Sequence, residues 1–153
     1  MTILSLADVE LHSFHWDNFS PEILKAHSSV MHYLDIPIQY TQKNIPHGQW
    51  LDDVMKQATS DVIVVIEPDL IPLNRKIIDD AIQYVLKNDT FLGCAQVSNH
   101  IGTASHIFAS PAFFVITRSC YEKLGAPSFM PNKQGDVAEA LAFAAEAKGI
   151  RYR

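Results

Sequence analysis

Two carboxylates, Glu67 and Asp69, stand directly after a continuous apolar run at positions 62–66. A run of this kind is typical of a central parallel strand that is covered on both faces. Pro68 lies between the two acids. Because proline cannot donate a hydrogen bond to a sheet and restricts the residue before it, we expect the strand to end there. If both acidic residues are extended, their side chains, two positions apart, point to the same side.

This pair of acids falls where open α/β sheets bind their ligands, at the carboxyl ends of the strands. Two hard oxygen ligands suit Mg²⁺ or Mn²⁺, which would take its remaining ligands from water and from a substrate phosphate. The sequence therefore predicts that Glu67 and Asp69 bind a metal ion and, through it, a phosphorylated cofactor or substrate. A solvated strand end, where acidic residues and proline are common, is the alternative interpretation.

The elements around this pair alternate between strands and helices. The expected strands are Val9–Phe14, Ile36–Gln42, Val62–Ile66, Phe91–Val97 and Ala112–Arg118. Apolar periodicity and start signals place helices after Ser20, after Gly48, after Asn74, at the capping box Ser119–Glu122 and after Asp136. This alternation predicts one α/β domain spanning residues 1–153, with a largely parallel sheet in a three-layer arrangement.

Composition excludes several classes of protein. The net charge of -5 and the pI of about 5.7 argue against a nucleic-acid surface, since no run of lysine or arginine is present. The first residues have no basic start and are interrupted by Asp8 and Glu10, so we expect neither a signal peptide nor a membrane span. Two cysteines without a paired pattern fit a reducing compartment, and we expect a cytoplasmic protein.

The spacing of the glycines and histidines argues against dinucleotide, P-loop and zinc sites. The six glycines form neither a G-x-G-x-x-G fingerprint nor a Walker loop, which disfavours a dinucleotide or P-loop site. The seven histidines match no recognised zinc spacing. In an acidic domain that binds a phosphorylated ligand, a cation between protein carboxylates and phosphate is the most economical arrangement.

Three segments resemble the GT-A-fold glycosyltransferases, especially the family 2-like group. The segment "HGQWLDDVMKQATSDVIVVIEPDLIPLN" is similar to the family's helix and hydrophobic strand that end in an Asp-x-Asp motif. The segment "SPAFFVITRSCYEKLGAPSF" resembles its later strand, short helix and Leu-Gly turn, and "GDVAEALAFAAEAKGIRYR" resembles its helix led by an acidic residue. The resemblance implies a Rossmann-like α/β/α fold of the nucleotide-diphospho-sugar transferase type.

The resemblance also implies a reaction and its residues. It implies transfer of a sugar from a nucleotide-diphosphate donor to an acceptor, which the sequence leaves open as a glycan, a lipid or a protein. By position, Asp69 matches the second aspartate of the motif and Glu67 stands at the first, where Mn²⁺ or Mg²⁺ would bridge to the donor diphosphate. Asp136 matches the later acidic residue that acts as the catalytic base in inverting members.

The sequence departs from the family pattern at three places. Glu67 is one methylene longer than the usual aspartate, the family's Glu-Asp pair is here Gly135-Asp136, and no aspartate follows the second expected strand. A truncated GT-A domain that binds a nucleotide, a glycan or a protein partner without catalysing transfer is therefore the alternative function.

Some residues allow both a functional and a structural interpretation. Asp136 can serve as a base or as the N-cap of the last helix, where aspartate is favoured. Arg118 can hold a diphosphate or simply close a strand. Trp16 and Trp50 can stack on a base or sugar, or pack against the core.

Overall fold

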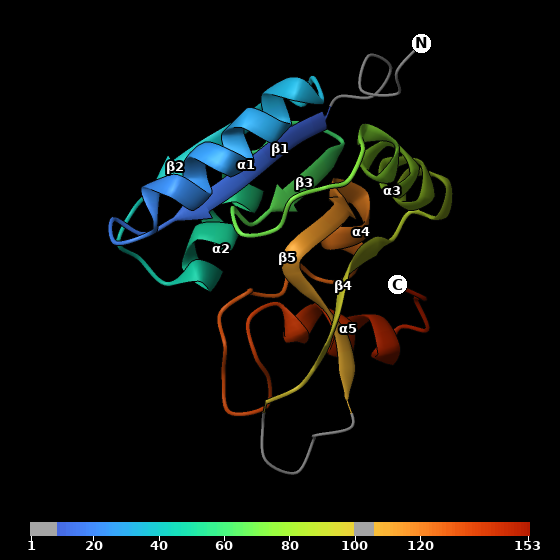
Figure 1. Cartoon of the computed structure of the whole chain (residues 1–153). Helices are drawn as coiled ribbons and strands as arrows, with labels where there is room; N and C mark the ends of the chain where they lie inside the picture. Colours follow the sequence, from blue (N-terminus) through green and yellow to red (C-terminus); the bar gives the residue numbers. More distant parts are fainter. Residues whose placement is uncertain (1–8, 100–105) are drawn as a thin grey trace.

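The computed structural model describes residues 9–99 and 106–153, in which a five-stranded sheet has helices packed around it (Figure 1). The strands are β1 (Val9–His15), β2 (Ile38–Gln42), β3 (Val62–Ile66), β4 (Phe91–Val97) and β5 (Ile107–Thr117). The helices are α1 (Pro21–Tyr33), α2 (His47–Gln57), α3 (Arg75–Asn88), α4 (Arg118–Lys123) and α5 (Glu139–Ala147). The predicted α/β fold class is confirmed.

The strand order is β2-β1-β3-β5-β4, and β1 pairs in parallel with both β2 and β3. Strand β5 runs antiparallel to both of its neighbours, β3 and β4, so it is the reversed strand in a mostly parallel sheet. Residues 98–106 join β4 to β5. A connection this short suits an antiparallel pair, because a parallel pair needs a crossover of about a dozen residues or more.

The core has two halves, one on each face of the sheet. In β3, Ile63 and Val65 face the cluster formed with α2, α4 and α5, while Val62, Val64 and Ile66 face the cluster formed with α3 and the buried Met31 of α1. All five residues of β3 are buried. This two-sided burial explains why the run is apolar throughout instead of alternating.

The start signals in the sequence predict the N-caps of α1 and α3 correctly and misplace the N-cap of α4. Ser20 caps α1 by accepting from Ile23 N at 3.3 Å, and Asn74 caps α3 by accepting from Ile77 N at 3.2 Å, as predicted. The capping box expected at Ser119 is wrong, because the N-cap of α4 is Thr117, two residues earlier, whose Oγ1 accepts from Cys120 N at 3.1 Å. None of the helices that the structure describes is long and apolar enough to cross a membrane.

Candidate functional site

The chain leaves β3 through a tight turn that carries the two predicted metal ligands. Glu67 N still donates to Ala112 O of β5 at 2.8 Å, and Leu70 N donates back to Glu67 O at 3.0 Å. Pro68 and Asp69 therefore occupy the two central positions of the turn, where proline is favoured at the first. The expectation that Glu67 and Asp69 are both extended is wrong. The turn nevertheless leaves both side chains on the wall of one cavity.

That cavity, of about 140 Å³, lies between the turn and the end of β1. Its walls are the aromatic or imidazole rings of Phe14, His15, Trp16, Phe19 and His47, together with Glu67, Pro68 and Asp69. A second cavity, of about 180 Å³, shares His47 and Glu67 with the first and is completed by Gln96, Ser110, Pro111, Ala112, Asp136 and Val137. Glu67 thus stands between the two cavities. Asp69 lines the first cavity, and Asp136 lines the second.

The electrostatics of this wall leave Glu67 without a neutralising cation. Burial raises the pKa of Glu67 to about 7, with a smaller contribution from the charge of Asp69. His47 Nδ1 lies 3.4 Å from Glu67 Oε1, but burial lowers the pKa of His47 to about 4, so the imidazole is neutral at physiological pH. Neither cavity is lined by a lysine or an arginine among the residues that the structure describes.

Glu67 and Asp69 fit a cation that takes its remaining ligands from water or from a bound phosphate. Within residues 9–99 and 106–153, no three His, Cys, Asp or Glu side chains are grouped so that they could hold a metal ion by themselves. Mg²⁺ and similar ions commonly use one or two carboxylates and take the rest of their ligands from water and phosphate. Glu67 and Asp69 would be those carboxylates.

His47 is a site residue that sequence reasoning missed. It is the first residue of α2, and its ring lies parallel to Phe14, with centroids 5.6 Å apart, and close to parallel to Trp50, at 5.7 Å. Its Nε2 is buried and has no hydrogen-bond partner in the part of the chain that the structure describes. The signal available in the sequence was its position, directly after Pro46 at the start of the helix that leads into β3.

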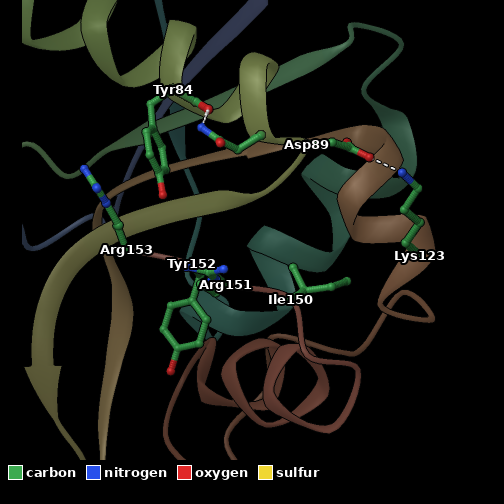
Figure 2. Close-up of a pocket in the computed structure, with 8 residues that line it drawn as sticks. Tyr84, Asp89, Lys123, Ile150, Arg151, Tyr152 and Arg153 are labelled. Carbon is green, nitrogen blue, oxygen red and sulfur yellow. Dashed lines mark hydrogen bonds and ion pairs between the residues drawn. The ribbon is translucent and has the colours of Figure 1, made fainter.

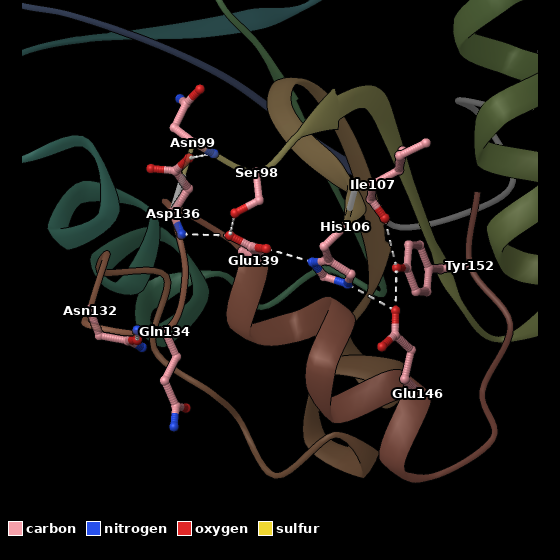
Figure 3. Close-up of polar contacts among 10 residues, drawn as sticks. All are labelled: Ser98, Asn99, His106, Ile107, Asn132, Gln134, Asp136, Glu139, Glu146 and Tyr152. Atoms are coloured by element: carbon pink, nitrogen blue, oxygen red, sulfur yellow. Dashed lines mark hydrogen bonds and ion pairs between the residues drawn. The ribbon is translucent and has the colours of Figure 1, made fainter. Parts of the chain in front are cut away.

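Asp136 belongs to a polar network that joins α5 to the end of β4 (Figure 3). Asp136 Oδ2 accepts from Asn99 N at 3.1 Å, and Asp136 N donates to Glu139 Oε2 at 2.7 Å. Helix α5 begins only at Glu139, with Ala138 as its N-cap at a φ of 70°. The interpretation of Asp136 as the N-cap of the last helix is therefore wrong, and its carboxylate instead binds the backbone of Asn99, two residues after β4.

Glu139 is the fully buried centre of this network. Besides Asp136 N, its carboxylate accepts from Ser98 Oγ at 3.0 Å and lies 2.5 Å from His106 Nδ1 (Figure 3). Burial alone would raise the pKa of Glu139, but these hydrogen bonds outweigh it and bring the pKa below its usual value. Burial likewise opposes the charged form of His106, yet Glu139 and Glu146 outweigh it and raise the pKa of His106 above its usual value.

Gly135 lies against Glu139 and Phe143. A Cβ at this position would lie 3.2 Å from both Cβ and Oε2 of Glu139, and equally close to the ring of Phe143. A larger side chain would have to displace this packing. The acidic group next to Asp136 therefore comes from Glu139, three residues later, and it is buried.

The two tryptophans and Arg118 lie in different environments. Trp50 is only 2% exposed and packs in the core, whereas Trp16 is 44% exposed and lines the first cavity, with its Nε1 donating to Ile45 O at 2.8 Å. Arg118 lies at the opposite end of β3, where its backbone N donates to Asp61 O at 2.9 Å. Arg118 is thus not placed to hold a ligand at Glu67.

A scan of the sequence against protein-family models gave no match, and a search of the curated proteins gave none either. Several solved structures are similar in shape. A197 from STIV superposes with a TM-score of 0.57 at 10% identity, over 88% of this chain and 78% of that one. The bifunctional IspDF from Campylobacter jejuni gives a TM-score of 0.55 at 12% identity, over 96% of this chain and 49% of that one.

A third similar structure is CMP:2-keto-3-deoxy-manno-octonic acid synthetase complexed with CTP, with a TM-score of 0.51 at 10% identity, over 96% of this chain and 88% of that one. At such low identities, similarity establishes the fold alone. The chain has a Rossmann-like α/β fold, which it shares with IspDF and the synthetase. The comparisons do not single out the family 2-like glycosyltransferases.

Proposed function

We propose that this protein binds a nucleotide-diphosphate sugar through a divalent cation and transfers the sugar to an acceptor. The observation that carries the proposal is the position of Glu67, between a cavity that holds Asp69 and a cavity that holds Asp136. Glu67 thus shares one cavity with the second proposed metal ligand, Asp69, and the other cavity with the candidate base, Asp136. That arrangement is what a transfer at the end of a diphosphate requires.

Charge is the main argument for the cation. A diphosphate entering either cavity would meet Glu67 and one further acidic side chain, while the adjacent imidazole of His47 is neutral. Like charges at close range in a poorly solvated cavity repel strongly. A divalent cation removes this repulsion, and Mn²⁺ or Mg²⁺ held by Glu67 and Asp69 would also stabilise the charge of the departing diphosphate as a Lewis acid.

The walls of the two cavities suggest how the ligand is divided between them. The exposed face of Trp16 supports stacking of a nucleotide base in the first cavity. The sugar and the acceptor hydroxyl then belong in the second cavity, where Asp136 would accept the proton of that hydroxyl as a general base. The hydrogen bond from Asn99 N holds one oxygen of Asp136 in place.

One observation favours a second function, nucleotide binding without transfer. Glu139 fills the space beside Gly135 and is completely buried, so the site has a single acidic group, Asp136, where the family has two. A domain of this kind would present a nucleotide-dependent surface to a glycan or protein partner. It would keep the contribution of Asp69 to binding and would show no turnover.

Calorimetric titration with UDP and GDP, with and without Mn²⁺, tests binding. Metal-dependent binding that is lost in Asp69→Asn and kept in Asp136→Asn supports both candidate functions. Release or transfer of sugar from a nucleotide donor, abolished in Asp136→Asn, then distinguishes transfer from binding alone. Absence of nucleotide binding under both conditions would refute both functions.

A further inference from the structure

A larger cavity, of about 650 Å³, lies at the other end of the sheet (Figure 2). It is lined by Tyr84, Asn88, Asp89, Lys123 and the segment 150–153. The nearby Thr117, which donates to Asp89 Oδ1, pairs with Val62, the first residue of β3. The cavity therefore lies at the amino end of β3, whereas Glu67 follows its carboxyl end.

The segment 150–153 is fixed by its backbone against the start of β4. Arg153 N donates to Phe91 O at 3.3 Å, and Gly93 N donates to Arg153 O at 2.8 Å. Thr90 Oγ1 donates to Arg151 O at 2.6 Å. The ring of Tyr152 stacks on Phe91 with centroids 4.8 Å apart, which anchors the middle of the segment to the core.

Arg151 and Arg153 flank this anchored tyrosine, and both line the cavity. The guanidinium of Arg153 lies over the ring of Tyr84, 4.6 Å from its centroid (Figure 2). The guanidinium of Arg151 has no hydrogen bond or ion pair with any residue that the structure describes. On a protein with a net charge of -5, two arginines that line one cavity are a local concentration of positive side chains.

The acidic residue of the cavity does not neutralise these arginines. Asp89 Oδ1 accepts from Thr117 Oγ1 at 2.7 Å, and Asp89 Oδ2 accepts from Ser119 Oγ at 3.2 Å and pairs with Lys123. Burial alone would raise the pKa of Asp89, but these partners lower it below its usual value. Asp89 is therefore paired with Lys123, and neither arginine side chain forms an ion pair with it among the residues that the structure describes.

We propose that this cavity binds a small phosphate-bearing anion, held by Arg151 and Arg153 and separate from the Glu67 site. Guanidinium groups recognise phosphate with paired, parallel hydrogen bonds. With two guanidinium groups lining one cavity, two linked phosphate groups offer each of them a partner. The volume of the cavity lies within the range of small-molecule sites.

The test is calorimetric titration of the whole chain with inorganic phosphate, pyrophosphate and UMP in the presence of EDTA. Removal of divalent metal leaves the acidic Glu67 site without its means of binding an anion. Pyrophosphate should bind more tightly than phosphate, and the double variant R151Q/R153Q should lose about tenfold or more in affinity. Tighter binding of UMP than of pyrophosphate would identify a nucleotide as the source of the phosphate group.

Two variants serve as controls, and a third repeats the test with a single substitution. Lys25→Gln removes an exposed positive charge on α1 and should leave the affinity within about twofold of wild type. E67Q/D69N should bind pyrophosphate as wild type does, which keeps this proposal independent of the proposed function. Arg151→Gln alone removes a guanidinium that has no hydrogen bond or ion pair with the described residues, so its fold should be intact even where the double variant is destabilised.

No binding of any of the three anions by the wild-type protein would overturn the proposal. So would undiminished binding by the folded R151Q variant and the double variant, or loss of binding in E67Q/D69N.

Discussion

Glu67 and Glu139 are two carboxylates withdrawn from solvent, and their surroundings differ sharply. Glu139 is completely buried, yet Asp136 N, Ser98 Oγ and His106 surround its carboxylate, and its pKa is lowered. The side chain of Glu67 is 28% exposed, and the imidazole of His47 lies 3.4 Å from its carboxylate. The pKa of Glu67 is raised to about 7. The difference lies in the number of donors and not in the depth of burial.

This contrast separates the structural carboxylate of Glu139 from that of Glu67, which we propose binds a cation. Glu139 has its full set of partners within the fold, so it fixes the start of α5 and, through it, the backbone of Asp136. Glu67 lacks a compensating charge, so binding of a cation would relieve an unfavourable state. We therefore expect changes at Glu139 to act mainly on stability and changes around Glu67 to act mainly on binding.

The largest expected effect is on stability, at Glu139. Glu139→Ala leaves Asp136 N, Ser98 Oγ and His106 without their common acceptor. Removing one partner of a buried ion pair is strongly destabilising, so the free energy of unfolding should fall by about 3 kcal/mol or more. Urea denaturation measures this fall. Glu139→Gln, which keeps an acceptor oxygen, should lose less, and a loss below about 1 kcal/mol in Glu139→Ala would contradict the structural role.

The pH dependence of stability should distinguish the two glutamates in metal-free protein. Because the folded pKa of Glu67 is raised from 4.5 to about 7, the folded state holds a proton that the unfolded state has lost. The contribution of Glu67 is therefore present below pH 4.5 and is lost as the pH rises toward 7, by up to about 3 kcal/mol. Glu67→Gln should remove this fall.

The contribution of Glu139 has the opposite sign. Its folded pKa lies below its value in the unfolded chain, so its stabilisation is present at neutral pH and is lost as the solution is acidified through that lowered pKa. Thermal unfolding followed between pH 3 and pH 8 in wild type, Glu67→Gln and Glu139→Gln would measure both slopes. Identical profiles for wild type and Glu67→Gln would show that Glu67 is not the uncompensated group.

A smaller effect is expected at Asp69, on binding alone. Asp69 is exposed in its turn, so Asp69→Asn should leave the melting temperature close to that of wild type. It removes a proposed ligand of the cation, and the Mn²⁺-dependent affinity for UDP or GDP should fall about tenfold or more. Asp53→Asn, on α2, is a matched control that should bind normally. Equal affinities for wild type and Asp69→Asn would remove Asp69 from the metal site.

The smallest effect is expected at His47. His47→Phe keeps the stacking on Phe14 and Trp50 but removes the nitrogen next to Glu67, so the carboxylate should be less well oriented. The Mn²⁺-dependent nucleotide affinity should weaken by about threefold to tenfold at unchanged stability. His47→Gln, which keeps a polar group there, should recover part of the loss. Stronger binding in His47→Phe would contradict an orienting role.

Features set by local chemistry could be predicted from the sequence. The apolar run 62–66 defined β3, Pro68 marked its end, and Ser20 and Asn74 placed the starts of α1 and α3. Each of these signals acts within a few residues of the element that it defines. The position of Glu67 at the sheet edge that carries the two cavities followed directly from them.

Features set by long-range contacts could not be predicted in this way. The start of α5 depends on Glu139, whose partners Ser98 and His106 are 41 and 33 residues away in the sequence. The turn at Pro68 and Asp69 depends on continued pairing of Glu67 with β5, and the importance of His47 appears only when α2 packs against β1. The reversed direction of β5 likewise depends on which strands become neighbours.

Electron paramagnetic resonance of Mn²⁺ with the purified protein and UDP or GDP tests the central claim most directly. The account predicts that protein and nucleotide together immobilise Mn²⁺, that the signal of bound ion is lost in E67Q/D69N, and that it persists in Asp136→Asn. A bound-ion signal that is the same in wild type and E67Q/D69N would contradict the assignment of Glu67 and Asp69 to the cation.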